Sequence, residues 1–151
     1  MLTTKSGYAV LALACLHGEE NWVLVADIAA RTGAPRPYLH KILHALGTWG
    51  MVKSKRGYNG GVVLARSATD INLLEVIDAV EGRQRIHRCM LGLEECTDER
   101  ACPAHEFWSE KRRLIEEKLS NTTLAQVAAF ERREGGRLKS VQELEETLEQ
   151  S

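Results

Sequence analysis

The chain has 151 residues, of which 44% are hydrophobic and 27% are charged. This length suits one compact domain with an appendage and leaves little room for a second full domain. The formal net charge of −1 conceals an asymmetry: residues 1–66 carry eight Lys and Arg against three Asp and Glu (+5), whereas residues 67–151 carry twelve against eighteen (−6). A basic half joined to an acidic half favours nucleic-acid binding coupled to a separate sensing or association function.

Tyr8 to Leu16 forms an apolar run, but no convincing export cleavage site follows it. No stretch reaches the ~18 apolar residues that a membrane span needs. We therefore expect a cytoplasmic protein with no membrane partner. In that reducing compartment, clustered cysteines serve as metal ligands or redox groups more often than as disulfides.

The basic half has the pattern of a helix-turn-helix. Ser6 to Leu16 predicts a largely buried first helix that Gly18 ends, with Cys15 as a small buried hydrophobe. Val25 to Arg31 predicts a short second helix, and Gly33 supplies the turn out of it. These two elements would support a recognition helix further along the chain.

That third helix is predicted to begin at the Ala34-Pro35-Arg36-Pro37 segment, where proline is tolerated, and to run through Leu46. Four apolar residues recur at helical spacing and make its core face: Leu39, Ile42, Leu43 and Leu46. The other face carries the side chains that a recognition helix needs in a major groove. We predict DNA contacts here from Arg36, Pro37, Tyr38, His40 and Lys41, with His44 nearby on the same face.

Two short apolar stretches flank a basic, glycine-rich turn between Met51 and Leu64, which predicts a β-hairpin. After a helix-turn-helix such a hairpin would be the wing, although a solvated turn remains the alternative. A phosphate-binding P-loop is disfavoured, since no Gly-Lys-Ser/Thr element is present. Basic residues would meet phosphates or the minor groove, and Gly57, Gly60 and Gly61 would let the backbone approach the duplex. The predicted contacts are Lys53, Lys55, Arg56, Tyr58, Asn59 and Gly60, joined by Thr3 and Lys5 near the N-terminus.

The acidic half begins with a capping-box pattern, Asn72 followed by Glu75, that predicts a helix ending near Gly82. Residues 83–101 then lack apolar periodicity and hold Cys89 and Cys96. Without a bound ion such a loop would have little to fold around.

Cys102-Pro103-Ala104-His105 is predicted to open the next helix, with Pro103 as its first residue and His105 one turn in. The helix dipole would then favour a thiolate at Cys102. An apolar stripe follows on this helix, which reaches about Ser120. The stripe consists of Phe107, Trp108, Leu114, Ile115 and Leu119.

Two further segments follow this helix. Thr122 or Thr123 is predicted to cap a segment through Phe130, and an acidic amphipathic helix is predicted after Ser140.

Three thiols and an imidazole in one short segment indicate a metal site. Thiolates are the preferred ligands of zinc and of iron–sulfur clusters, and a histidine can supply one position. The spacing of Cys89, Cys96, Cys102 and His105 does not separate these two groups. An enzyme with Cys102 and His105 as nucleophile and base is disfavoured, because no oxyanion-hole or substrate-pocket pattern accompanies them.

Several of these segments together resemble the Rrf-type winged-helix family of bacterial transcription regulators, which includes IscR-like and NsrR-like iron–sulfur regulators. The resemblance covers about residues 1–130, and its most specific parts are the wing and the cysteine loop. It is carried by Leu2 to Val10, by Tyr38-Leu39, by Arg56-Gly57 to Gly60-Gly61 and by the three cysteines.

The resemblance implies a mainly α fold with a small β-hairpin, in which a winged helix-turn-helix is joined to a long dimerisation helix. It also implies a homodimer that binds an operator on double-stranded DNA, as a repressor or an activator, and that pairs its subunits through the apolar stripe. The stripe could instead pack back on its own domain. The expected regions are 1–66 for DNA binding, 67–82 for a connecting helix, 83–105 for the cysteine loop and 103–130 for dimerisation. Residues 131–151 lie outside the resemblance and are expected to form an acidic tail, either helical or disordered.

The resemblance also favours a 2Fe–2S or 4Fe–4S cluster over zinc on the three cysteines. IscR-like members use a histidine shortly after the third cysteine, which matches His105. NsrR-like members use an N-terminal aspartate of the partner subunit, but Gly7 stands at the matching position here. A zinc-stabilised DNA- or protein-binding module without a redox sensor remains the alternative.

Overall fold

The computed structural model describes residues 3–83, 88–92 and 96–133. The predicted glycine break at 135–136 and the helix after Ser140 therefore lie outside the described residues. In chain order the elements are α1 (Thr4–Leu16), α2 (Val25–Thr32), α3 (Arg36–Thr48), β1 (Val52–Lys55), β2 (Gly61–Leu64), α4 (Leu73–Glu81), a 3₁₀ turn (Asp98–Arg100), α5 (His105–Ser120) and α6 (Leu124–Glu131).

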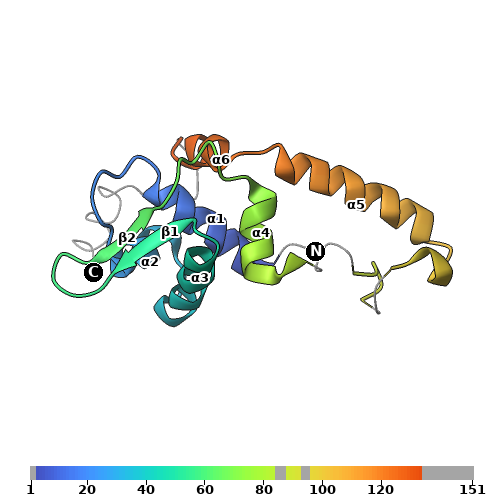
Figure 1. Ribbon diagram of the computed structural model, residues 1–151, viewed down its shortest axis with the longest axis horizontal. Helices are drawn as coiled ribbons and strands as arrows, with labels where there is room; N and C mark the ends of the chain where they lie inside the picture. Colours follow the sequence, from blue (N-terminus) through green and yellow to red (C-terminus); the bar gives the residue numbers. More distant parts are fainter. Residues whose placement is uncertain (1–2, 84–87, 93–95, 134–151) are drawn as a thin grey trace, which may run out of the picture.

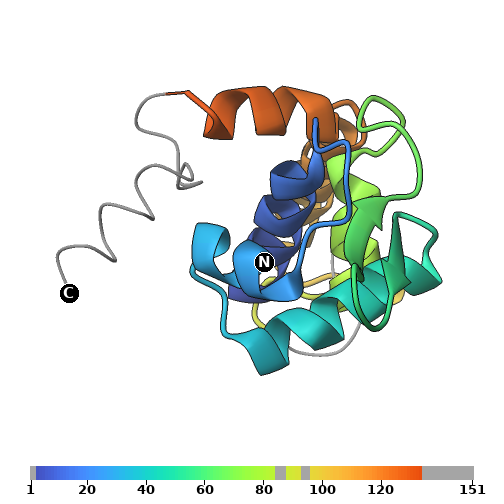
Figure 2. The same cartoon turned by 90° about the vertical axis from the view of Figure 1, so that its left-hand side faces the viewer.

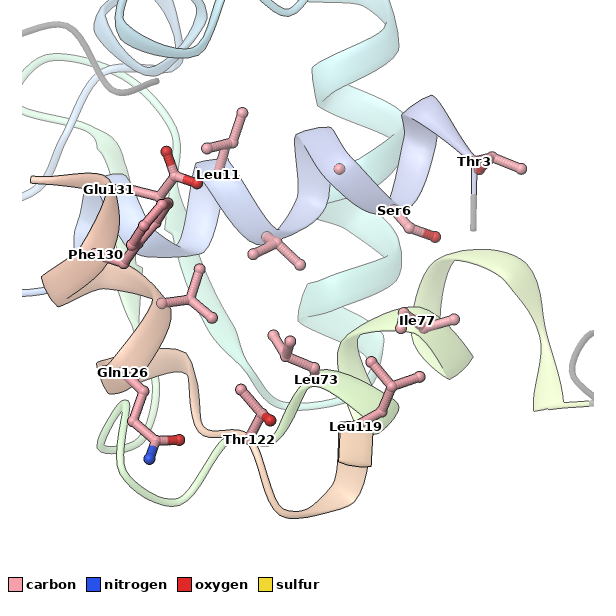
Figure 3. A pocket seen from close by; sticks show the side chains of 13 residues that line it. Thr3, Ser6, Leu11, Leu73, Ile77, Leu119, Thr122, Gln126, Phe130 and Glu131 are labelled. Carbon is pink, nitrogen blue, oxygen red and sulfur yellow. The ribbon is translucent and has the colours of Figure 1, made fainter. Parts of the chain in front are cut away.

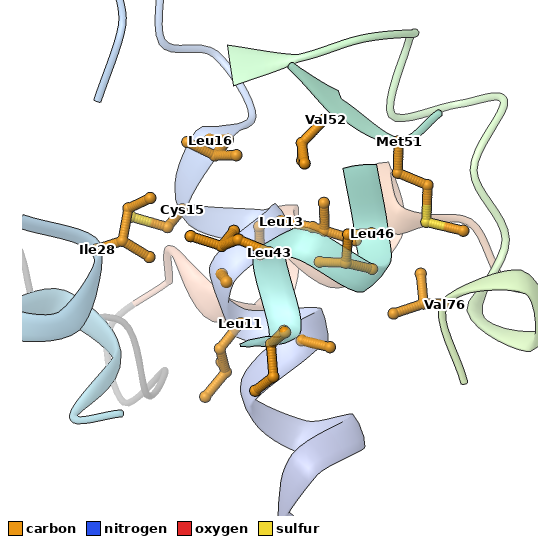
Figure 4. Close-up of a cluster of buried hydrophobic side chains, with 14 of the residues drawn as sticks. Leu11, Leu13, Cys15, Leu16, Ile28, Leu43, Leu46, Met51, Val52 and Val76 are labelled. Atoms are coloured by element: carbon orange, nitrogen blue, oxygen red, sulfur yellow. The ribbon is translucent and has the colours of Figure 1, made fainter. Parts of the chain in front are cut away.

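Helix α1 lies at the centre of the fold and packs against α2, α3, α4 and α6. Figure 2 shows α1 enclosed between α6 on one side and α2 and α3 on the other. Leu13 and Cys15 of α1 are fully buried, as are Ile28 of α2 and Leu46 of α3 (Figure 4). Burying an aliphatic side chain of this size stabilises a fold by roughly 1.5–3 kcal/mol, so this cluster holds the helices in place.

The helix-turn-helix is confirmed. Gly33 caps α2 with φ 71°, a left-handed conformation that favours glycine over residues with a side chain. Pro35 is the N-cap of α3, and its carbonyl accepts a hydrogen bond from the Leu39 amide. The four predicted apolar residues of α3 are buried, so the opposite face of the helix is left toward solvent.

The hairpin is also confirmed: β1 and β2 pair antiparallel, with Val52 opposite Leu64 and Lys55 opposite Gly61. The sequence did not predict that a third segment pairs with this hairpin. Val23 exchanges two backbone hydrogen bonds with Val62, of 3.0 and 2.8 Å, and so ties the α1–α2 connection to the wing.

Both predicted caps in the second half are present. The Asn72 side chain accepts from the Glu75 amide at 3.0 Å in a complete capping box, and Thr123 forms a second one with Gln126. A short bridge pairs Asn72 with Thr123. The chain therefore leaves α4, makes the cysteine loop and α5, and returns to the start of α4.

Helix α5 begins two residues later than predicted. Pro103 and Ala104 form a turn, closed by a 2.8 Å hydrogen bond from the His105 amide to the Cys102 carbonyl, and His105 is the first helical residue. Cys102 therefore stands outside the helix, before its N-cap Ala104. Figure 1 shows α5 running away from the other helices, with the cysteine segments at its far end.

Candidate DNA interface and metal centre

A groove of about 600 Å³ lies between α3 and the wing. Helix α3 contributes His40 and His44, and the wing contributes Lys55 and Arg56. These four side chains are all exposed. His44 was noted on this face in the sequence but not included among the predicted contacts, and its place one turn after His40 is the signal that identifies it.

The other predicted contacts on α3 and the wing are exposed as well: Arg36, Pro37, Tyr38, Lys41, Lys53, Tyr58 and Asn59. Tyr58 at the wing tip is 95% exposed, so nothing in its own chain covers it. Tyr38 stands edge-on to the Tyr8 ring with centroids 6.1 Å apart, a contact that fixes the start of α3 against α1.

Two of the wing glycines have a different role from the predicted one. A Cβ at Gly60 would lie 2.4 Å from the Lys55 carbonyl oxygen, and Gly60 is buried inside the turn. A Cβ at Gly61 would lie 2.5 Å from the Val23 carbonyl oxygen. These residues are therefore needed for the packing of the wing itself, whereas Gly57 is open to solvent at φ 90°.

Thr3 and Lys5 lie away from the groove. The Thr3 hydroxyl donates to the Glu81 carboxylate, and the Lys5 ammonium donates to the Val80 carbonyl. Ser6, which is buried, also donates to Glu81 at 3.0 Å. The start of α1 is thus attached to the end of α4, and we leave Thr3 and Lys5 out of the proposed DNA surface.

The four predicted metal ligands line one small hollow. Cys89, Cys96, Cys102 and His105 surround it together with Trp108 of α5. The three loop cysteines are free thiols and half-buried. The Trp108 indole donates to the Arg88 carbonyl at 2.8 Å, which fastens the loop beside Cys89 to α5. The structure places all four donors on the lining of this hollow.

His105 is held from both sides of its ring. Its Nδ1 atom lies 3.1 Å from the Cys96 sulfur, and its Nε2 atom lies 3.0 Å from an Asp98 carboxylate oxygen. The His105 side chain is only 12% exposed, whereas that of Asp98 is 98% exposed. Asp98 was not singled out as a partner of His105 by the sequence.

The donors suit a soft metal or a cluster, because thiolates and an imidazole are the ligands that such groups prefer. Among the described residues, however, no three His, Cys, Asp or Glu side chains are already gathered as a metal-binding group. The hollow is therefore lined by donor atoms of the right kind, from the loop and the start of α5, that are not gathered around one point.

Cys15 is chemically different from the loop cysteines. It is fully buried among the core helices, and this burial raises the pKa of its thiol to about 11. A protonated thiol is a poor nucleophile and a poor ligand, so Cys15 is a packing residue, as the sequence predicts.

A second, apolar groove of about 430 Å³ lies between α1, α4, α6 and the end of α5 (Figure 3). Leu73, Ile77 and Leu119 line it, and Phe130 stands at its edge with 53% exposure. Of the predicted stripe on α5, Leu119 is 9% exposed and contributes to this groove. Phe107 and Leu114 are 56% and 42% exposed.

A winged helix-turn-helix with a basic groove beside its recognition helix is the structure of a DNA-binding transcription regulator. The family model named Rrf2, described as an iron-dependent transcriptional regulator, matches residues 2–129, and this chain belongs to that family. Its relatives are regulators and not enzymes. No helix in the described part of the chain is long and apolar enough to cross a membrane.

The HTH-type transcriptional regulator IscR of Serratia proteamaculans is 37% identical over 128 residues, which cover 83% of this chain and 77% of the relative. Two solved structures are similar as well. CymR, the global cysteine regulator of B. subtilis, has a TM-score of 0.71 at 28% identity, covering 86% of this chain and 97% of that chain. T. potens IscR has a TM-score of 0.68 at 32% identity, covering 86% and 87%.

Proposed function

We propose that this chain is a homodimeric transcription regulator whose operator binding is modulated by an iron–sulfur cluster on Cys89, Cys96, Cys102 and His105. The observation that carries the proposal is the shared hollow, which is lined by three free thiols and an imidazole at the start of α5. The family's description as iron-dependent supports it. Operator binding would place its action in the cytoplasm.

The chain's own residues would bind and enclose the group. Thiolates from the loop and the His105 imidazole would supply the ligand atoms, and Trp108 would cover one side of the site. The bound cluster would supply a redox-active and labile centre that responds to oxygen, nitric oxide or iron supply.

Helix α5 and the apolar groove would form the subunit interface. Phe107 and Leu114 are exposed on a helix that projects from the protomer, and Phe130 is exposed beside the groove. A second copy of the chain would cover these apolar side chains, since symmetric pairing buries the same patch twice. It would also present two recognition helices about 34–36 Å apart, one turn of DNA.

The DNA contacts would come from the groove between α3 and the wing. Arg36, His40 and Lys41 would approach base edges or phosphates, and Lys55 and Arg56 of the wing would meet the flanking backbone. Because these side chains are exposed and basic or hydrogen-bonding, they support this surface better than any other part of the described chain.

Two connections would link the cysteine loop to DNA binding. His105 is the first residue of α5, so ligation there acts on the dimerisation helix. At the other end of the loop, the Arg83 guanidinium lies 5.0 Å from the centre of the Trp49 ring, and Trp49 is the C-cap of α3. A change in the loop would therefore reach both the interface and the recognition helix.

The test begins with anaerobic purification and measurement of iron, sulfide and zinc per chain, with a visible absorption spectrum. Iron and sulfide with charge-transfer bands support the proposal, whereas a colourless protein with stoichiometric zinc supports the zinc-stabilised module. Operator affinity of loaded and metal-free protein is then compared, and sedimentation gives the oligomeric state. Equal operator affinities of loaded and metal-free protein, on every operator tried, would contradict the proposed coupling between the cluster and DNA binding.

A further inference from the structure

The two ring nitrogens of His105 face two different environments. Nδ1 faces Cys96 and the hollow at 3.1 Å, and Nε2 faces the Asp98 carboxylate at 3.0 Å, on the side away from the sulfur. Asp98 reaches this position because it begins the 3₁₀ turn between Cys96 and Cys102. The turn places its carboxylate beside Nε2 while leaving it almost fully in solvent.

An ionised carboxylate accepts hydrogen bonds and has none to donate. The proton on the neutral imidazole is therefore held at Nε2, and Nδ1 is left with its lone pair toward the hollow. A histidine ligand needs that lone pair, and partner groups on the other nitrogen orient the ring and raise its basicity.

The distance across the Cys96–His105 contact agrees with this assignment. Sulfur and nitrogen donors on one tetrahedral metal, with bonds of about 2.3 and 2.0 Å, lie roughly 3.5 Å apart. The observed 3.1 Å is short of this by a few tenths of an ångström. Replacement of the thiol proton by a metal would require only a small outward movement of the two side chains.

We propose that Asp98 is a positioning residue for His105, which holds the imidazole so that Nδ1, and not Nε2, is the ligand atom. This inference rests on the proposed function and deepens it. Glu99 beside Asp98 has another role: hydrogen bonds from its own backbone amide and from the Thr97 hydroxyl hold the pKa of its carboxyl below the usual range.

The experiment compares Asp98→Ala with Glu99→Ala in the full-length, metal-loaded protein. Each variant removes one exposed carboxylate from the same turn, and only the first removes a partner of His105. Removing a group that orients a metal ligand typically costs 10–100-fold in affinity. We expect release of metal to a chelator to be at least ~10-fold faster in Asp98→Ala and unchanged in Glu99→Ala. Asp98→Asn, which keeps a carbonyl acceptor, should restore most of the loss.

A spectroscopic measurement identifies the ligand atom directly. Histidine labelled with ¹⁵N only at Nδ1 should give the strong, directly bonded coupling in pulsed EPR of the reduced cluster. A weak, remote coupling would assign Nε2 and overturn the inference, as would identical chelator kinetics in Asp98→Ala and Glu99→Ala.

The two proposals fail in different ways. A protein that holds zinc contradicts the iron–sulfur function, while the chelator comparison still decides the role of Asp98. Wild-type protein that holds iron and sulfide, with no difference between the two alanine variants, contradicts only the role of Asp98. A chain that binds neither metal removes both.

Discussion

The DNA-binding part of the chain and the cysteine-bearing part are built in different ways. In the first, Leu13, Ile28, Leu39 and Leu46 are fully buried and every helix packs against α1 or its neighbours. In the second, α5 buries a single residue, Leu119, and the three cysteines are half-buried around a small hollow. The first part supplies its own core, whereas the second has little core of its own and would be completed by the metal and the second subunit proposed above.

The two kinds of cysteine give the sharpest test of this difference. Cys96→Ala should lose nearly all bound iron, because it removes a proposed ligand that also contacts His105. Cys15→Ala is the matched control, since it removes a thiol from the core and leaves the hollow intact. Iron per chain measures both. Equal iron content in the two variants would show that Cys96 is not part of the metal site.

Cys15 also tests the core by its pH dependence. Its folded pKa is about 11 against 9.0 for an unperturbed thiol, because burial disfavours the thiolate. The unfolded thiol therefore ionises first as pH rises, so the stabilisation is complete below pH 9 and is lost between pH 9 and about 11. A shift of about two pKa units corresponds to about 3 kcal/mol.

Urea unfolding of wild type and Cys15→Ala at pH 8 and pH 10.5 measures this effect. The variant is expected to be less stable at pH 8 because a packed side chain is shortened. The free energies of unfolding of wild type and Cys15→Ala should then converge as pH rises, because only the wild type loses the contribution of the buried thiol. Parallel pH profiles would show that Cys15 ionises freely in the folded protein.

The local signals in the sequence were sufficient for the first part. Gly33, the Asn72 box and the apolar spacing of α3 each act within a few residues, so the helices, their ends and the hairpin could be predicted. The Val23–Val62 pairing could not be predicted, because it joins segments that are distant in sequence.

The cysteine loop was predicted as a ligand set but not in its geometry. Pro103 has the pattern of a first helical residue, yet a turn from Cys102 to His105 stands there and the helix begins only at His105. The contact between Asp98 and His105 became visible only when the 3₁₀ turn placed the two side chains together. Exposed acidic residues are common, and nothing in their spacing identifies one as a partner.

The wing offers a test of the DNA surface that leaves the metal site untouched. Arg56→Ala should weaken operator binding roughly tenfold and lower the slope of log affinity against log salt by about 1, as expected for loss of one phosphate contact. Lys53→Ala is the comparison, because Lys53 is on β1 but does not line the groove with Arg56. Fluorescence anisotropy at several salt concentrations would measure both. An equal loss of operator affinity in the two variants would indicate that DNA is attracted by the general positive charge of the wing and not by the groove in particular.

The smallest expected effect concerns the contact that joins the two parts. Arg83→Ala removes the guanidinium from the Trp49 ring at the end of α3. An exposed cation–π pair contributes about 0.5–1 kcal/mol, so the difference in operator affinity between loaded and metal-free protein should shrink by about threefold. Arg88→Ala removes the same charge from the same loop, where the backbone carbonyl and not the side chain receives the Trp108 hydrogen bond. If both variants keep the full difference, the loop acts on DNA through α5 and the subunit interface alone.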